Sequence, residues 1–201
     1  MRGVCDDAPI ARLILVNGPP ASGKSTLAHR YVADHDRASL VEIDVLRMTL
    51  PNWEEDEASR LVARDMAGVA VVEHLGAGSD VIMPQYFGGL GYISLLENMA
   101  REHGATFIEV ILAIDARLAI ERFRSRRQVY AGLGERHPER DIADAEAESF
   151  ILDAVDRLSR LPNVRTESRI VSVEVDASED AVYRRLLSVL GDQNASSLDA
   201  Q

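Results

Sequence analysis

The chain has 201 residues, of which 46% are apolar, a size and composition typical of one soluble globular domain. Its formal net charge of −11 argues against a surface that binds nucleic acid and against attraction to an anionic membrane. With one cysteine, no signal-peptide core and no apolar run near the roughly 18 residues of a membrane span, we expect a cytoplasmic protein.

Apolar runs and helical patterns alternate along the chain. Five strands are predicted, at 12–18, 39–44, 80–86, 106–115 and 169–177. Helices are predicted at 24–34, 54–75, from the glycine-rich turn after the third strand to about 102, at 116–127, at about 141–160 and at 179–190. The helix at 54–75 is indicated by the near-helical spacing of apolar residues such as Leu61, Val62 and Val69.

This alternation is typical of βαβ units, which form a parallel sheet with helices on both faces. We therefore predict a single domain over residues 1–201 with an α/β, three-layer fold and a five-stranded parallel sheet. A small lid is expected at about 127–141, and the polar tail at about 192–201 is expected to be disordered.

A glycine-rich stretch, VNGPPASGKST, occupies residues 16–26 between the first strand and the first helix. It contains Gly18-x-x-x-x-Gly23-Lys24-Ser25, a pattern in which the backbone N–H groups and the helix N-terminus surround a phosphate. We expect Lys24 to reach the β- and γ-phosphates and Ser25 to ligate Mg²⁺. The other residues of this cradle are Ala21, Ser22 and Thr26.

The strand–loop–helix context disfavours the alternative, a glycine turn without function. The basic residues agree, because Lys24 is the only lysine among 22 lysines and arginines. A compact ammonium fits between phosphate oxygens, where a broad guanidinium does not. The stretch therefore predicts a nucleoside triphosphate site with Mg²⁺.

Two sequence patterns that the chain lacks narrow the class of P-loop protein. The chain has no base-reading Asn-Lys-x-Asp stretch of the kind found in GTPases, and the strand at 80–86 does not end in Asp or Asp-Glu. A strand ending of that kind is usual in hydrolytic motors. The pattern therefore counts against a remodelling ATPase.

Three segments together, GPPASGKST at 18–26, IDVLR at 43–47 and ERFRSRR at 121–127, resemble the small kinase group of P-loop proteins. This group contains chloramphenicol phosphotransferase, zeta-toxin kinases, gluconate kinase and the tunicamycin-resistance protein. The resemblance covers most of residues 12–190, and VIMPQYF at 81–87 is similar to the tunicamycin-resistance type in particular. It implies an ATP- and Mg²⁺-dependent kinase for a hydroxyl of a small molecule, such as an antibiotic or another natural product.

Asp44 lies at the carboxyl end of the second predicted strand, where ligands bind in open α/β sheets. A carboxylate there can accept the proton of an acceptor hydroxyl or orient Mg²⁺-bound water, and the resembled kinases have their proposed base in this motif. The alternative is a helix N-cap before VLRMTL. Arg47 would face the same cleft and bind the acceptor or the transferring phosphoryl group, unless it is a surface arginine.

Arg122 and Arg126 are one helical turn apart and share a face, whereas Arg124 and Arg127 point elsewhere. In the resembled kinases, such a pair at the lid entrance clamps the phosphates and stabilises charge as the γ-phosphoryl group moves. The alternative is that these arginines form salt bridges with the acidic helix at about 141–156.

The remaining candidates come from the ends of two strands. Gln85 and Tyr86, before a Gly-Gly-x-Gly turn, can hydrogen-bond an uncharged acceptor, or can belong to an ordinary connection. Trp53 either covers the acceptor pocket or anchors packing. Asp176, in VDAS at 175–178, is placed by the resemblance beside the adenine base.

A second class of function also fits the sequence. A nucleotide-dependent resistance protein would sequester its ligand with slow ATP hydrolysis, and a toxin would phosphorylate a nucleotide-linked sugar. The acceptor-side residues are too generic to name the acceptor, and the sequence leaves the oligomeric state open.

Overall fold

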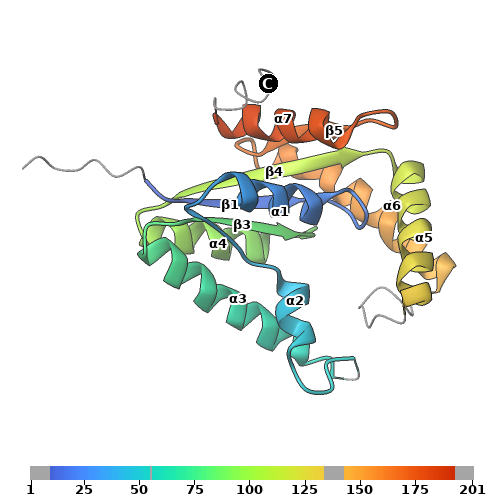
Figure 1. Ribbon diagram of the computed structural model, residues 1–201, viewed down its shortest axis with the longest axis horizontal. Helices are drawn as coiled ribbons and strands as arrows, with labels where there is room; N and C mark the ends of the chain where they lie inside the picture. Colours follow the sequence, from blue (N-terminus) through green and yellow to red (C-terminus); the bar gives the residue numbers. More distant parts are fainter. Residues whose placement is uncertain (1–9, 55, 134–142, 193–201) are drawn as a thin grey trace, which may run out of the picture.

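The computed structural model describes residues 10–54, 56–133 and 143–192, and the structural statements below refer to these residues. They form a parallel five-stranded sheet of order β2-β3-β1-β4-β5 between layers of helices (Figure 1). The strands are β1 (Arg12–Asn17), β2 (Ala38–Leu40), β3 (Asp80–Gln85), β4 (Thr106–Ile114) and β5 (Arg169–Val173). The predicted α/β fold with a five-stranded parallel sheet is confirmed.

Helices cover both faces of this sheet. The helices are α1 (Lys24–Asp34), α2 (Ile43–Met48), α3 (Ser59–Gly76), α4 (Leu90–Glu102), α5 (Ala116–Leu133), α6 (Asp144–Arg160), the 3₁₀ turn η1 (Leu161–Asn163) and α7 (Glu179–Leu190). Helices α1 and α7 share one core with the sheet, and α3 and α4 share the other. Helix α5 stands beyond the ends to which the strand arrows point, with α6 beside it (Figure 1).

Strand β1 lies at the centre of the sheet because both of its faces are apolar. Ile14 and Val16 point into the core under α1 and α7, and Leu13 and Leu15 into the core under α3 and α4. All four are fully buried, and each burial contributes about 1.5–3 kcal/mol. The strand therefore delivers its carboxyl end, and the loop that follows, to the middle of one sheet edge.

The helix that follows β1 lies on one face of the sheet, and the helix that follows β3 lies on the other. Neighbouring strands with connections on opposite faces leave a crevice at their carboxyl ends, where open α/β sheets bind ligands. The topology thus predicts a site between the β1–α1 loop and the β3–α4 loop.

Two strands are shorter than predicted. The second strand ends at Leu40 rather than at residue 44, because β2 is an edge strand that pairs with β3 over only three residues. The fifth strand ends at Val173 rather than at residue 177, where its pairing with Ile114 of β4 also ends. Asp44, the last residue of one predicted strand, and Asp176, which lay inside the other, therefore both lie beyond the strands that the structure shows.

The first residues of the predicted lid belong to a helix. Helix α5 continues to Leu133, so residues 127–133 are helical rather than part of a lid loop. Residues 134–142 of the predicted lid and 193–201 of the predicted tail lie outside the described residues.

Helix α3 exists where it was predicted but starts later, at Ser59, and buries another set of residues. Its buried face consists of small and medium residues at intervals of four, namely Ser59, Ala63, Ala67, Val71 and Leu75. Leu61, Val62 and Val69, whose spacing indicated the helix, are exposed. Small side chains bring α3 close to its neighbours, and a Cβ on Gly68 would lie 3.1 Å from Met99 of α4.

No helix among the described residues is both long enough and apolar enough to cross a membrane.

Candidate nucleotide-binding and phosphotransfer site

The loop between β1 and α1 is curled tightly at the carboxyl edge of the sheet. Ala21 and Gly23 both have a positive φ, of 61° and 94°, which lets the backbone turn back on itself. A Cβ on Gly18 would lie 2.6 Å from Ser22 Oγ and 3.2 Å from Leu112 Cβ, so only glycine fits there. A left-handed alanine costs about 1–2 kcal/mol. Such strain is typical of functional loops.

The residues of this loop fit a polyphosphate. Ser22 is 2% exposed, and its Oγ has no hydrogen-bond partner among the described residues. A buried hydroxyl without a partner costs about 1–3 kcal/mol, which a phosphate oxygen would offset by accepting a hydrogen bond from it. Lys24 Nζ donates to the Pro19 carbonyl at 2.8 Å, so the ammonium folds over the loop at the place where a phosphate would lie.

The same loop fits Mg²⁺. Ser25 is exposed in the first turn of α1, directly after Lys24. In the described parts of the chain, no group of three or more His, Cys, Asp or Glu side chains is placed to hold a metal ion. Mg²⁺ is usually bound by substrate phosphates, waters and only one or two protein groups, so the exposed hydroxyl of Ser25 beside the phosphate-binding loop is compatible with it.

A cavity of about 210 Å³ adjoins the loop. It is lined by residues of the P-loop, α1, α5, the end of β5 and the start of α7: Ser22, Gly23, Thr26, Leu27, Arg122, Val173, Ala177, Glu179 and Val182. Phosphate-binding groups, an arginine and apolar walls therefore meet in one pocket. Asp176 is exposed in the turn that carries Ala177 and does not line the cavity, so its predicted role beside the base is not supported by a contact.

The arginines of α5 divide between two tasks. Arg122 lines the cavity, as its predicted role requires. Arg124 pairs with Glu148 and Arg127 with Asp144, so these two residues form the salt bridges to α6 that the alternative interpretation predicted. The guanidinium of Arg126 lies 5.8 Å from the centre of the Phe123 ring. The salt-bridge interpretation therefore holds for Arg124 and Arg127, whereas the phosphate-clamp role of Arg122 and Arg126 stays a prediction, and Arg126 is not among the residues that line the cavity.

Asp44 is exposed in the first turn of α2. The N-cap of this helix is Glu42, so the alternative interpretation of Asp44 as the N-cap is wrong. His29 of α1 lies 3.1 Å from Glu42 and connects the start of α2 to the P-loop helix. A first-turn carboxylate is stabilised by the helix dipole by about 0.3–1 kcal/mol. The structure thus leaves Asp44 accessible, and its role as base or metal ligand stays a prediction.

Arg47 is buried in the last turn of α2, where it contacts the segment between α2 and α3. Its Nε donates to Ser59 Oγ at 2.8 Å, its Nη2 donates to the Trp53 carbonyl at 2.9 Å, and its guanidinium lies over the Trp53 ring. Burial lowers the pKa of this arginine. These contacts make Arg47 an anchor of the turn, so it is not a surface arginine. They also identify Trp53, which is 7% exposed, as a packing anchor.

On the β3–α4 loop, Tyr86 packs against α6. Its ring meets the Phe150 ring edge-on, with centroids 5.5 Å apart, and burial raises the pKa of its phenol. A Cβ on Gly88 would lie 2.4 Å from Tyr86 Oη and 2.9 Å from Arg157 Cδ. Gly88 is therefore required for this placement of the ring. Gln85 is half-buried at the end of β3, beside the last residue of β1.

A buried polar cluster behind the P-loop was missed from the sequence. Asn17 Nδ2 donates to the Phe87 carbonyl and to Glu109 Oε1, and Phe87 N donates to Asn17 Oδ1, all at 3.0 Å. Glu109 Oε2 accepts from Arg165 Nε at 2.8 Å and from Ser168 Oγ at 2.6 Å. The cluster ties the residue before Gly18 to the β3–α4 loop. Its signal was a polar residue inside each of two apolar strands.

The protein family described as "AAA domain" matches residues 13–148, which is more than half of the chain. The matched region runs from β1 and the P-loop to the first turns of α6. A search among curated proteins finds no significant match.

Solved structures of low sequence identity share the fold. A putative kinase from Chloroflexus aurantiacus has a TM-score of 0.61 at 18% identity, over 90% of this chain and 97% of that one. The tunicamycin resistance protein of Deinococcus radiodurans has a TM-score of 0.59 at 15% identity, over 90% and 96%. A chain of the Pnkp1/Rnl/Hen1 RNA repair complex has a TM-score of 0.63 at 18% identity, over 81% of this chain but 49% of that one.

The chain thus spans about half the length of the RNA repair chain that it matches, and nearly all of the other two. At these low identities, the similarity to solved structures establishes the fold alone. The match to the family model establishes that the chain belongs to that family. The chain therefore belongs to the AAA domain family and has a P-loop kinase-like α/β fold.

Proposed function

We propose that the protein is a Mg²⁺·ATP-dependent kinase that transfers the γ-phosphoryl group to a hydroxyl of a small molecule. The observation that carries this proposal is the meeting of the P-loop and Arg122 in one cavity. Phosphoryl transfer depends mainly on positioning and on stabilising the charge of the transferred group. A phosphate cradle faced by an arginine from a separate helix supplies both.

On the donor side, the amides of the loop and the ammonium of Lys24 hold the phosphates. The orphan Ser22 hydroxyl donates to a phosphate oxygen, and Ser25 holds the metal. When bound, Mg²⁺ neutralises charge on the phosphate oxygens. Arg122 and Arg126 stabilise the charge that develops during transfer.

On the acceptor side, Asp44 is the proposed base or metal ligand. Its exposure in α2 leaves its carboxylate accessible to a hydroxyl. Gln85 ends the neighbouring strand β3 at the same edge of the sheet, and Tyr86 follows it in the β3–α4 loop. Arg47 holds the turn after α2 in place. A direct contact between Arg47 and the acceptor is also part of this proposal. The likeness to a tunicamycin resistance protein supports an antibiotic or another natural product as acceptor.

The test is a screen of hydroxyl compounds with Mg²⁺·ATP, read as a mass gain of one phosphoryl group on the acceptor. The panel includes nucleoside antibiotics, other natural products, sugar acids and nucleotide-linked sugars. A product on any one of them supports a kinase and names the acceptor class. Hydrolysis of ATP with no phosphorylated product across the panel would favour the sequestering protein with slow hydrolysis.

The role of Asp44 is tested with a matched pair of variants. Asp44→Asn removes the proposed base, and Asp36→Asn removes another exposed carboxylate, between α1 and β2. We expect Asp44→Asn to lower turnover roughly 10²- to 10⁴-fold while ATP still binds, and Asp36→Asn to leave turnover unchanged. Wild-type turnover in Asp44→Asn would remove Asp44 from the chemistry.

A further inference from the structure

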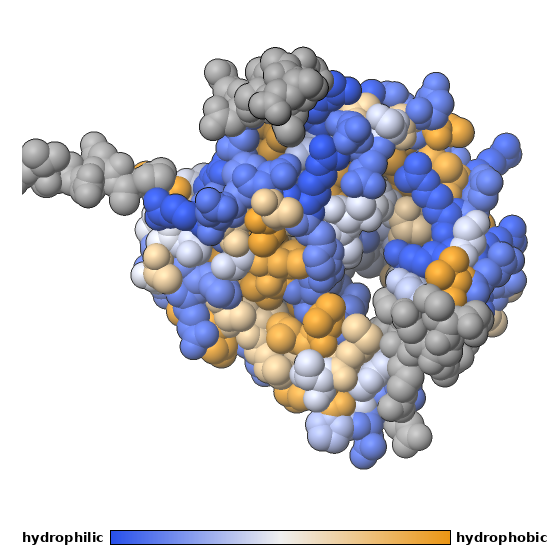
Figure 2. All heavy atoms as spheres, in the orientation of Figure 1, coloured by the Kyte–Doolittle hydropathy of each residue, from blue (hydrophilic) through white to orange (hydrophobic). Residues whose placement is uncertain are grey.

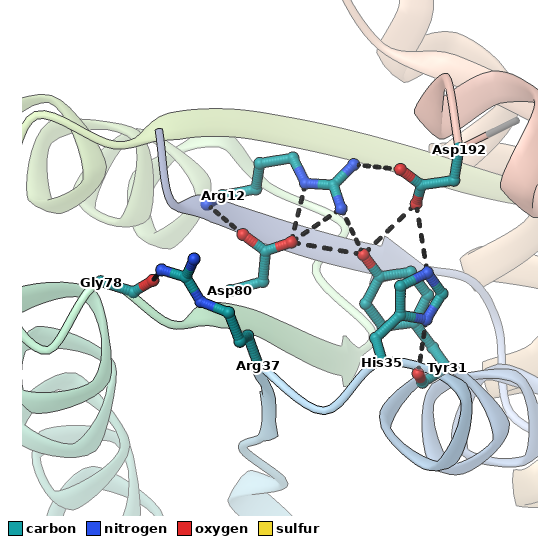
Figure 3. A network of polar contacts seen from close by, with 7 residues as sticks. All are labelled: Arg12, Tyr31, His35, Arg37, Gly78, Asp80 and Asp192. Atoms are coloured by element: carbon teal, nitrogen blue, oxygen red, sulfur yellow. Dashed lines mark hydrogen bonds and ion pairs between the residues drawn. The ribbon is translucent and has the colours of Figure 1, made fainter. Parts of the chain in front are cut away.

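A polar network lies at the amino edge of the sheet, at the far end of the strands from the P-loop (Figure 3). Its centre is Arg12, the first residue of β1. The Arg12 backbone N–H and Nε donate to the two carboxylate oxygens of Asp80, both at 2.8 Å. Arg12 Nη1 donates to Asp192 Oδ1 at 2.7 Å, and Nη2 donates to Tyr31 Oη at 2.6 Å.

The same network joins the carboxyl ends of two helices. Tyr31 and His35 belong to the last turn and the C-cap of α1, and their rings stack at 4.0 Å. Asp192 follows Gly191, the C-cap of α7, and its Oδ2 lies 3.3 Å from Tyr31 Oη and 3.8 Å from His35 Nε2. One carboxylate therefore holds the end of α7 against the end of α1 and against β1.

The opposite ends of these two helices form walls of the candidate nucleotide pocket. Thr26 and Leu27 line it from the first turn of α1, and Glu179 and Val182 line it from the first turn of α7. Between the two ends, Arg30 of α1 contacts α7 through an ion pair and a ring. Because short helices move as rigid rods, a shift at one end of α7 is transmitted to the pocket at the other end.

We propose that Asp192, with Arg12 and Tyr31, is a positioning residue for the nucleotide pocket. By fixing the carboxyl ends of α1 and α7, it sets the spacing of their amino ends and hence the fit of the nucleoside between them. The inference rests on the nucleotide site of the proposed function and is independent of the acceptor.

The probes that test it are Mg²⁺·ADP and Mg²⁺·tripolyphosphate, measured by titration calorimetry on the full chain. Tripolyphosphate engages the P-loop, whereas ADP also places a nucleoside between α1 and α7. In Asp192→Asn we expect the affinity for ADP to fall roughly three- to tenfold, with the affinity for tripolyphosphate within about twofold of wild type. A purely structural role would weaken both probes in parallel or neither.

Two further variants make the result decisive. Glu174→Gln breaks the 2.9 Å pair with Arg185, which holds α7 without reaching α1, and should leave both affinities unchanged. Tyr31→Phe removes only the phenol oxygen and should reproduce the loss for ADP to a smaller extent, which covers the case in which Asp192→Asn fails to fold.

Parallel losses for both probes, or unchanged ADP affinity together with a lower melting temperature, would overturn the inference. A wild-type protein that binds neither probe would overturn the pocket assignment and this inference with it. A wild-type protein that binds ADP but phosphorylates no acceptor would count against the kinase alone.

Discussion

The two edges of the sheet treat their polar groups in opposite ways. At the amino edge, Arg12, Asp80 and Asp192 satisfy one another at 2.7–2.8 Å and are largely withdrawn from water. At the carboxyl edge, the Ser22 hydroxyl is buried without a partner among the described residues, and Asp44 is exposed. Figure 2 shows the molecule hollowed between α5 and the layers of the fold. Polar groups that bond to one another stabilise the fold, whereas polar groups that are exposed or have no partner within the fold are available to bind a ligand.

The largest expected effect is on the buried polar cluster behind the P-loop. Its polar groups bond to one another, like those of the amino edge, although the cluster lies next to the candidate site. Arg165→Ala would leave Glu109, whose side chain is 1% exposed, as a buried carboxylate without a cationic partner, held only by its hydrogen bonds from Asn17 and Ser168. We expect unfolding to become easier by about 3–5 kcal/mol, measured by chemical denaturation. Arg160→Ala, which breaks an exposed pair with Asp156, is the control. Equal effects of the two variants would contradict the closed cluster.

The next effect belongs to the open edge. Lys24→Ala removes an ammonium that would bind phosphate oxygens, so the affinity for ATP should fall about ten- to hundredfold, from a charged hydrogen bond of about 1.5–3 kcal/mol. The melting temperature should change little, because the lysine is not part of the core. Binding and thermal unfolding are measured on the same sample. A large loss of stability with unchanged ATP affinity would show that Lys24 stabilises the fold rather than binds the ligand, contrary to the role expected for the carboxyl edge.

The closed network also predicts a response to alkaline pH. Burial raises the pKa of the Tyr31 phenol above its ordinary value of 10.0, so the folded state holds this proton more tightly than the unfolded chain does. The resulting stability is fully present below about pH 10 and is lost as the pH rises above it. Wild type should therefore lose stability more steeply than Tyr31→Phe as the pH rises from about 10 to 12, as measured by denaturation at several pH values. Parallel curves would show that Tyr31 does not titrate in this way.

The smallest effect is expected where charges pair in water. Glu148→Gln breaks the pair with Arg124 between α5 and α6, and both side chains are partly exposed, at 53% and 36% for Arg124 and Glu148. Such pairs contribute about 0–1 kcal/mol, so the melting temperature should change by a few degrees at most. A larger shift would mean that this pair, like the amino-edge network, holds an element in place.

Several features of the site were predictable because they are local in the sequence. The strand, the glycine-rich loop and the helix that follow one another at 12–34 carry their own geometry, and the structure places Ser22 of this loop on the cavity. The side-chain roles at longer range were not predictable. Arg47 was expected to meet the acceptor, but its contacts with Ser59 and Trp53 depend on how the turn after α2 folds.

The sequence by itself determined the order of strands and helices, the two-sided burial of the sheet and the phosphate-binding loop. These follow from hydrophobic periodicity and from residues that are neighbours along the chain. Only the tertiary structure decided which face α3 buries, which arginines of α5 reach the pocket, and that Arg12 meets Asp192 across 180 positions. Such contacts produce no periodic pattern in the sequence. A charged residue is the same letter whether its side chain is solvated by water or pairs with a residue at the other end of the chain.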